Sequence, residues 1–174
     1  MRRTLLVGGI KARLGRVDLP AVLASGIVSS VAYALVMEVD RKLTGSRVDD
    51  LVLVGRPFVP GRPDLARKVG AVVHLVNGTS LAIAYAAFGH HALPGPTWLR
   101  GAILLNIENI ALYPIMALDR YHPAVRDGQL QSYWSWPSFL ESIPPHVVYG
   151  LCVGPLYEAM RAKPLPGQDE PVRS

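Results

Sequence analysis

Four apolar blocks, at residues 19–39, 69–88, 98–118 and 136–160, constrain the fold of this chain more than any other feature. Each block is close to the roughly 20 residues that an α-helix needs to cross the hydrocarbon core of a bilayer. A helix satisfies its own backbone hydrogen bonds, so it is stable where no water is present. The blocks therefore predict an all-α, multi-pass protein of the cell membrane with four transmembrane helices.

The composition agrees with a membrane protein. Half of the residues are apolar and 18% are charged, against about 25% charged residues in an average soluble domain. The formal charge of +5 arises from basic residues near the N-terminus and in the first long loop. No motif for nucleic acid accompanies them, so the expected partners are membrane lipids with anionic head groups, and not nucleic acid.

The expected organisation has three parts. Residues 1–17 form a basic N-terminal arm, residues 18–162 form the transmembrane domain, and the proline-containing tail 163–174 is predicted to be disordered. A long polar loop, 42–68, separates the first two spans. Within it, the segment 50–54 is predicted to be either a short strand or a segment on the membrane surface.

Small residues at four-residue spacing predict close helix packing. Such stripes let helices approach in lipid, where van der Waals contact replaces the hydrophobic effect. The predicted packing residues are Gly26, Ser30 and Ala34 in the first block, Gly78 and Ala82 in the second, and Gly150 and Gly154 in the fourth.

One pattern, His-x3-Gly-x3-small-x2-Tyr, occurs twice. Its copies are His74, Gly78, Ala82 and Tyr85, and His146, Gly150, Gly154 and Tyr157. These offsets fall on one stripe of a helix with 3.6 residues per turn. Each copy therefore places a histidine, two small residues and a tyrosine on one helical face.

A second motif, Met-x2-Asp-Arg, ends the first and third blocks. Its residues are Met37, Asp40 and Arg41, and Met116, Asp119 and Arg120. Two motifs that recur in the same order predict two tandem helical hairpins related by a parallel internal repeat, with its axis along the membrane normal. The aspartates and arginines are then interfacial charges at one membrane face, where they form ion pairs across the axis or bind lipid head groups.

Glu108 is the most informative polar residue, because it lies near the centre of the third block. An ionised carboxylate at that depth is costly, so we expect it to be protonated, paired or facing a cavity. One interpretation is structural, with Glu108 hydrogen-bonded to His74, His146 or Asn109. The alternative is a role in binding a proton, a ligand or a substrate.

The two stripe histidines leave three interpretations open. His74 and His146 are candidate axial ligands of a haem b, candidate catalytic partners of Glu108, or ordinary interhelical hydrogen-bonding groups. No catalytic residue is assigned beyond these three candidates. No metal site is predicted, because the adjacent His90 and His91 do not share a helical face and Cys152 is the only cysteine.

The histidine stripes and the Met-x2-Asp-Arg ends resemble a group of uncharacterised bacterial four-helix inner-membrane proteins, over residues 19–160. The resemblance implies the four-helix fold and brings no established activity. We therefore expect a membrane protein of unknown role that binds a lipid, a protein partner or a second copy of itself through the bundle and the long loop. The alternatives are a bis-histidine b-type cytochrome, and a membrane-embedded enzyme or proton-handling protein centred on Glu108.

Overall fold

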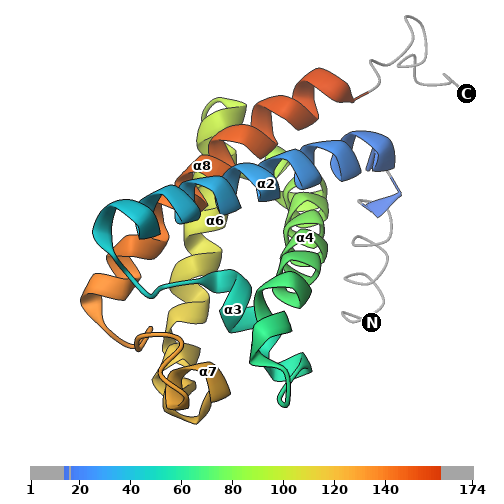
Figure 1. The fold of residues 1–174 in the computed structure, drawn as a ribbon. Coiled ribbons are helices and arrows are strands. Elements are labelled where there is room, and N and C mark those ends of the chain that lie inside the picture. Colours follow the sequence, from blue (N-terminus) through green and yellow to red (C-terminus); the bar gives the residue numbers. More distant parts are fainter. Residues whose placement is uncertain (1–13, 16, 162–174) are drawn as a thin grey trace, which may run out of the picture.

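The computed structural model describes residues 14–15 and 17–161, and the described chain consists of helices and connections without a strand (Figure 1). The predicted all-α class is therefore confirmed. The tail predicted at 163–174, and almost all of the arm predicted at 1–17, lie outside the described residues.

The first long helix, α2 (Leu19–Thr44), begins and ends where side-chain chemistry requires it. The carboxylate of Asp18 accepts a hydrogen bond from the Ala21 amide at 3.1 Å, which satisfies one of the free N–H groups of the first turn. Gly45, with φ of 72°, ends the helix in the left-handed conformation that glycine adopts at little cost. The helix extends past the predicted end of the span at residue 39, so Asp40 and Arg41 lie within it.

The predicted loop 42–68 is largely ordered, and its segment 50–54 is not a strand. It forms a short helix, α3 (Asp50–Gly55), and Asp49 caps its N-terminus, because the Asp49 side chain accepts from the amides of Leu51 and Val52. Two 3-10 turns, Arg56–Phe58 and Pro63–Leu65, then lead into α4 (Ala66–Ala84).

Glycines bring α3 against α4. A Cβ at Gly70 would lie 1.6 Å from the carbonyl oxygen of Leu51, and one at Gly55 would lie 2.0 Å from that of Ala66. Backbones this close leave no room for a side chain at either position. The loop thus folds back onto α4, and this places Asp50 inside the helical domain.

The second half begins after a π-helical segment, Tyr85–Gly89, and α5 (His90–Ala92). The helix α6 (Thr97–Leu112) continues as a 3-10 helix over Tyr113–Tyr121. The change of helix type follows from Pro114, which lacks an N–H group for the α-helical ladder. The chain then forms α7 (Pro123–Arg126) and α8 (Trp136–Met160), and α8 is continuous through Pro144 and Pro145.

Within the described residues, three helical segments are long and apolar enough to cross a membrane: Leu19–Thr44, Pro63–Ala92 and Thr97–Tyr121. Large apolar side chains also lie exposed on their outer faces, such as Val76 and Ile110, which are 63% and 61% exposed. A multi-pass membrane protein accounts for both observations. The fourth predicted span, α8, has 25 residues, but serines, glutamates and prolines interrupt it and it is not among the apolar segments.

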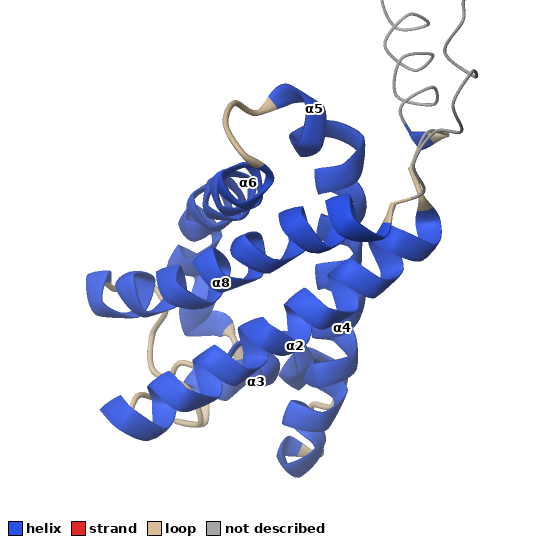
Figure 2. Cartoon of the chain, turned by 90° about the horizontal axis from the view of Figure 1, so that it is seen from above, coloured by secondary structure: helices blue, strands red, loops and turns tan. Residues whose placement is uncertain are grey.

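The long helices follow one another in space in the order α4, α2, α8 and α6 (Figures 1 and 2). The central pair, α2 and α8, run side by side, and α4 and α6 flank them. The neighbours α2 and α4 meet through the predicted small residues: Gly26 faces Ala82, and Gly78 faces Ser30.

The neighbours α6 and α8 also meet through glycine. A Cβ at Gly150 would lie 2.4 Å from backbone atoms of Ala102. Ser30 and Asn109 occupy equivalent positions in the two hairpins, because each lies seven residues before a Met-x2-Asp-Arg methionine. Identical packing would therefore bring Gly150 to Asn109, as Gly78 meets Ser30. Gly150 instead meets Ala102. The two hairpins therefore pack in different registers.

Candidate functional site

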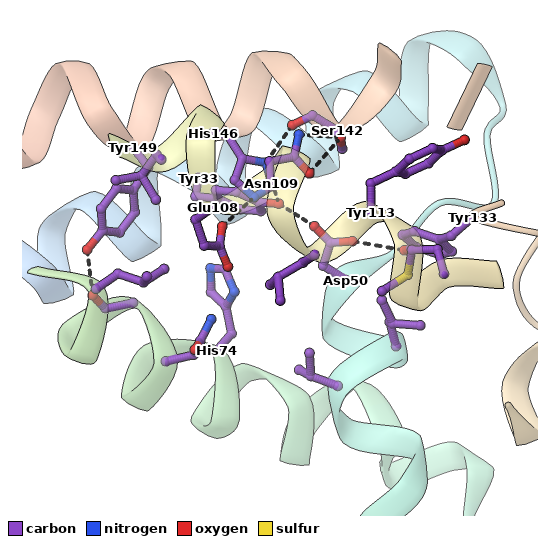
Figure 3. Close-up of a pocket in the computed structure, with 18 of the residues that line it drawn as sticks. Tyr33, Asp50, His74, Glu108, Asn109, Tyr113, Tyr133, Ser142, His146 and Tyr149 are labelled. Carbon is purple, nitrogen blue, oxygen red and sulfur yellow. Dashed lines mark hydrogen bonds and ion pairs between the residues drawn. The ribbon is translucent and has the colours of Figure 1, made fainter. Parts of the chain in front are cut away.

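A cavity of about 200 Å³ lies among the helices, and its lining includes residues of α4, α6 and α8; in Figure 3 α4 runs below the lining side chains and α8 above them. Most of its lining is apolar. Five of its ionisable and phenolic groups come from five separate helices: Tyr33 of α2, Asp50 of α3, His74 of α4, Glu108 of α6 and His146 of α8. The three sequence-predicted candidates, Glu108, His74 and His146, therefore face one cavity.

His146 and Glu108 form the central pair. The Nε2 atom of His146 lies 3.5 Å from the Oε2 atom of Glu108, and the Nδ1 atom lies 2.7 Å from the carbonyl oxygen of Ser142. Because a carbonyl oxygen only accepts, Nδ1 carries a hydrogen and donates it. The nitrogen that faces Glu108 is therefore Nε2.

The Oε2 atom of Glu108 is buried without a hydrogen bond of good geometry among the described residues. The 3.5 Å separation from His146 is an electrostatic contact and is too long for a strong hydrogen bond. A buried carboxylate oxygen that lacks a donor retains the capacity to accept one from a bound molecule.

Tyr33 lies between the two histidines. Its ring centroid is 4.9 Å from that of His74 and 4.9 Å from that of His146. Its hydroxyl donates to a carboxylate oxygen of Asp50 and lies 3.4 Å from His146 Nδ1. A continuous chain of polar contacts thus joins Glu108, His146, Tyr33 and Asp50.

Asp50 links the cavity to the loop between α7 and α8. Its other oxygen accepts a hydrogen bond of 2.9 Å from the hydroxyl of Tyr133. Burial, followed by the negative charge of Asp50, holds the pKa of Tyr133 well above its ordinary value. The Tyr133 hydroxyl therefore stays protonated and remains a donor to Asp50.

His74 and Asn109 have partners other than Glu108 among the described contacts. The Nε2 atom of His74 lies 3.2 Å from the carbonyl oxygen of Ser30, so it donates there and leaves Nδ1 as the acceptor. The side-chain amide of Asn109 donates to the Ser142 hydroxyl at 2.9 Å. Of the three partners expected for Glu108, the structure brings His146 to it.

The residues do not fit a bis-histidine haem. The ring of Tyr33 occupies the space between the two imidazoles, where a macrocycle would have to lie. The Nε2 atoms also face protein groups, namely the carbonyl oxygen of Ser30 and the carboxylate of Glu108. Within the described residues, no group of three or more His, Cys, Asp or Glu side chains is arranged to hold a metal ion.

The interfacial charges do not form the expected ion pairs across a repeat axis. Arg41 pairs with Glu38 at 3.1 Å and with Asp49 at 3.0 Å, and Arg67 of α4 pairs with the same two carboxylates. These contacts join α2, the start of α3 and α4. Asp40 makes no ion pair among the contacts described.

The second pair of interfacial charges, Asp119 and Arg120, also contacts neighbouring residues instead of the first pair. Asp119 accepts from the amides of Tyr133 and Trp134 at 2.5 and 3.1 Å, which fixes the loop before α8. Arg120 lies over the ring of Tyr121, 4.8 Å from its centroid. The two Met-x2-Asp-Arg ends therefore have different environments.

Sequence reasoning missed Tyr33, Asp50 and Tyr133 as members of the site. A signal for α3 exists, because Asp49 is a good N-cap and an apolar run follows it. No local signal indicates that α3 folds back against α4, or that Tyr33 faces both histidines.

The chain matches no family model, no curated protein sequence and no solved structure.

Proposed function

We propose that this chain is a four-span membrane protein that binds a lipophilic molecule with a polar head group in the cavity between α4 and α6. In this proposal α8 is the fourth span, and the helices form two tandem hairpins like those of the bacterial inner-membrane proteins that the sequence resembles. The packing of α2 on α4 and of α6 on α8 supports the hairpins.

One observation carries the proposal. Glu108, His146, Tyr33 and Asp50 come from four separate helices and line one cavity whose other walls are mostly apolar. Ligand pockets have this character: concave, largely apolar, with a few polar groups that fix orientation. Ionisable groups at membrane depth are costly and are retained where they serve a function.

The arrangement of the helices supports access from the bilayer. Leu81 of α4 and Leu105 and Leu112 of α6 line the cavity from opposite sides. The outward faces of the same helices carry Val76 and Ile110, which are exposed. The alkyl chain of a ligand can therefore contact apolar side chains along its whole path from the bilayer to the polar groups of the cavity.

Lipid extraction tests the proposal. The protein is purified in mild detergent, and the molecules that remain bound are identified by mass spectrometry. Leu81→Phe adds volume inside the cavity and should reduce the bound lipophilic molecule several-fold. Val76→Phe, on the exposed face of the same helix, is the matched control and should leave it unchanged. Equal retention by native protein and Leu81→Phe contradicts the proposal.

A second candidate function is proton handling or acid–base catalysis at the same site. The specific observation is the position of His146, with Nε2 toward Glu108 and Nδ1 within 3.4 Å of the Tyr33 hydroxyl. An imidazole between two such groups can pass a proton. Proteoliposomes that contain a pH-sensitive dye test it: this function requires a proton flux that Glu108→Gln abolishes.

A further inference from the structure

The charge of the cavity lining restricts the head group that it can accept. The described lining residues include two carboxylates, Asp50 and Glu108, and neither a lysine nor an arginine. The nearby arginines of α2 and α4, Arg41 and Arg67, are held by Glu38 and Asp49. An anionic head group such as a phosphate or a fatty carboxylate would meet like charge and no cationic partner.

The two imidazoles do not change this balance. His74 uses its Nε2 hydrogen on the carbonyl oxygen of Ser30, and His146 uses its Nδ1 hydrogen on that of Ser142. The polar atoms that are still free to bond a ligand are mainly hydrogen-bond acceptors. The clearest of them is Oε2 of Glu108, which accepts no hydrogen bond among the described residues. The cavity therefore complements a donor, and a cationic donor best of all.

We infer that the ligand class is a lipophilic amine, whose ammonium group pairs with Glu108 in the cavity between α4 and α6. The inference rests on the proposed function and specifies its ligand. An ammonium group gives Oε2 of Glu108 the hydrogen bond that it lacks and neutralises its charge. The Nε2 atom of His146 keeps its electrostatic contact with the same oxygen, at 3.5 Å.

Aromatic rings favour the same head group. Tyr33, Tyr113, Phe139 and Tyr149 all line the cavity. The hydroxyl of Tyr149 is already bonded to the carbonyl oxygen of Gly78 at 2.5 Å, so the ring is what it offers to a ligand. A cation over an aromatic face is attracted by the ring electrons, and this attraction is strongest where water is excluded.

The size of the cavity sets the position of the apolar tail. A volume of about 200 Å³ is smaller than the roughly 300–1,000 Å³ of pockets that enclose a whole drug-sized ligand. The head group and the first methylene groups therefore occupy the cavity. The rest of the alkyl chain extends between α4 and α6 into the lipid.

A matched series of ligands tests the inference. Decylamine, decanol and decanoate share one chain length and differ in their head group. Binding to the detergent-purified full chain is followed by tryptophan fluorescence, because Trp134 stacks on the cavity residue Tyr113 at 4.8 Å between centroids. Decylamine should bind saturably and at least tenfold more tightly than decanol, and decanoate should bind most weakly.

Two variants connect the preference to Glu108. Glu108→Gln keeps the shape of the side chain and removes the charge, so it should weaken decylamine binding about tenfold and leave decanol binding unchanged. Glu158→Gln, which alters a half-exposed glutamate near the end of α8, is the matched control and should bind like the native protein. Circular dichroism and gel filtration verify that both variants are folded.

The outcomes separate the inference from the proposed function. Saturable binding of decanoate or decanol as tight as that of decylamine, or full binding of decylamine by folded Glu108→Gln, overturns the amine inference and leaves a lipophilic ligand in place. Absence of saturable binding for all three compounds, together with no co-purified lipophilic molecule, overturns both.

Discussion

The Nε2 atom of His146 lies 3.5 Å from the Oε2 atom of Glu108, within a cavity bounded by candidate membrane spans. The pair joins α6 to α8 and gives Glu108 a partner at a depth where an isolated charge is costly.

A double-mutant cycle measures this pair. His146→Leu leaves the carboxyl group of Glu108 without its partner and should destabilise the protein by about 1–3 kcal/mol. The double variant His146→Leu/Glu108→Leu removes both polar groups and should recover part of that loss. Unfolding in detergent, followed by circular dichroism, gives the free energies. Strictly additive effects of the two substitutions would show that the pair is not coupled.

Tyr33 supplies a second stability test. Tyr33→Phe removes the hydroxyl that donates to Asp50 and leaves the ring between the two histidines. We expect a loss of about 1–2 kcal/mol, the usual cost of a buried hydrogen bond to a charged group. Tyr121→Phe is the control, because Tyr121 is 64% exposed, and it should lie within about 0.5 kcal/mol of the native protein. Equal stability of the two variants would argue against the Tyr33–Asp50 hydrogen bond.

Glycine substitutions test the seam between α6 and α8. Gly150→Ala places a Cβ 2.4 Å from backbone atoms of Ala102, which cannot rotate away. The helices must separate, at a cost of about 1–3 kcal/mol or more. Gly61→Ala is the matched control, since a Cβ there meets nothing within 4 Å. Thermal unfolding of both variants in one detergent should show a lowered midpoint for Gly150→Ala alone.

The stability of the folded protein should depend on pH through His122, which lies outside the candidate spans. Burial lowers the pKa of His122, and the charge of Arg56 lowers it further. The neutral ring donates from Nε2 to the Leu53 carbonyl oxygen at 2.9 Å and accepts at Nδ1 from the Ala124 amide at 3.2 Å. Protonation of Nδ1 would remove the second hydrogen bond.

The sign follows from the lowered pKa. The unfolded chain takes up a proton near the ordinary histidine pKa of about 6.5, whereas the folded chain does so only at lower pH. The contribution of His122 to stability is therefore complete above about pH 6.5 and decreases as the pH falls below it. Unfolding of native protein and His122→Gln at several pH values should show a smaller loss in the variant. The exposed His91, as His91→Gln, should retain the native pH dependence.

The sequence by itself determined the helical class, three apolar spans, the small residues at the α2–α4 contact and the candidacy of Glu108, His74 and His146. All of these follow from local quantities: the length of an apolar run, its helical period, and the cost of a carboxylate in lipid. The helices extend beyond the predicted spans, since α2 continues to Thr44 and α4 begins at Ala66.

Only the tertiary structure decided which groups meet. The fold-back of α3 brings Asp50 to Tyr33 and Tyr133, which lie 17 and 83 residues away in the sequence. The packing of α2 against both α4 and α8 places Tyr33 between His74 and His146, where the sequence alone had allowed a haem. Helical periodicity defines the face on which a side chain lies, but the packing of backbones through glycine contacts decides what covers that face.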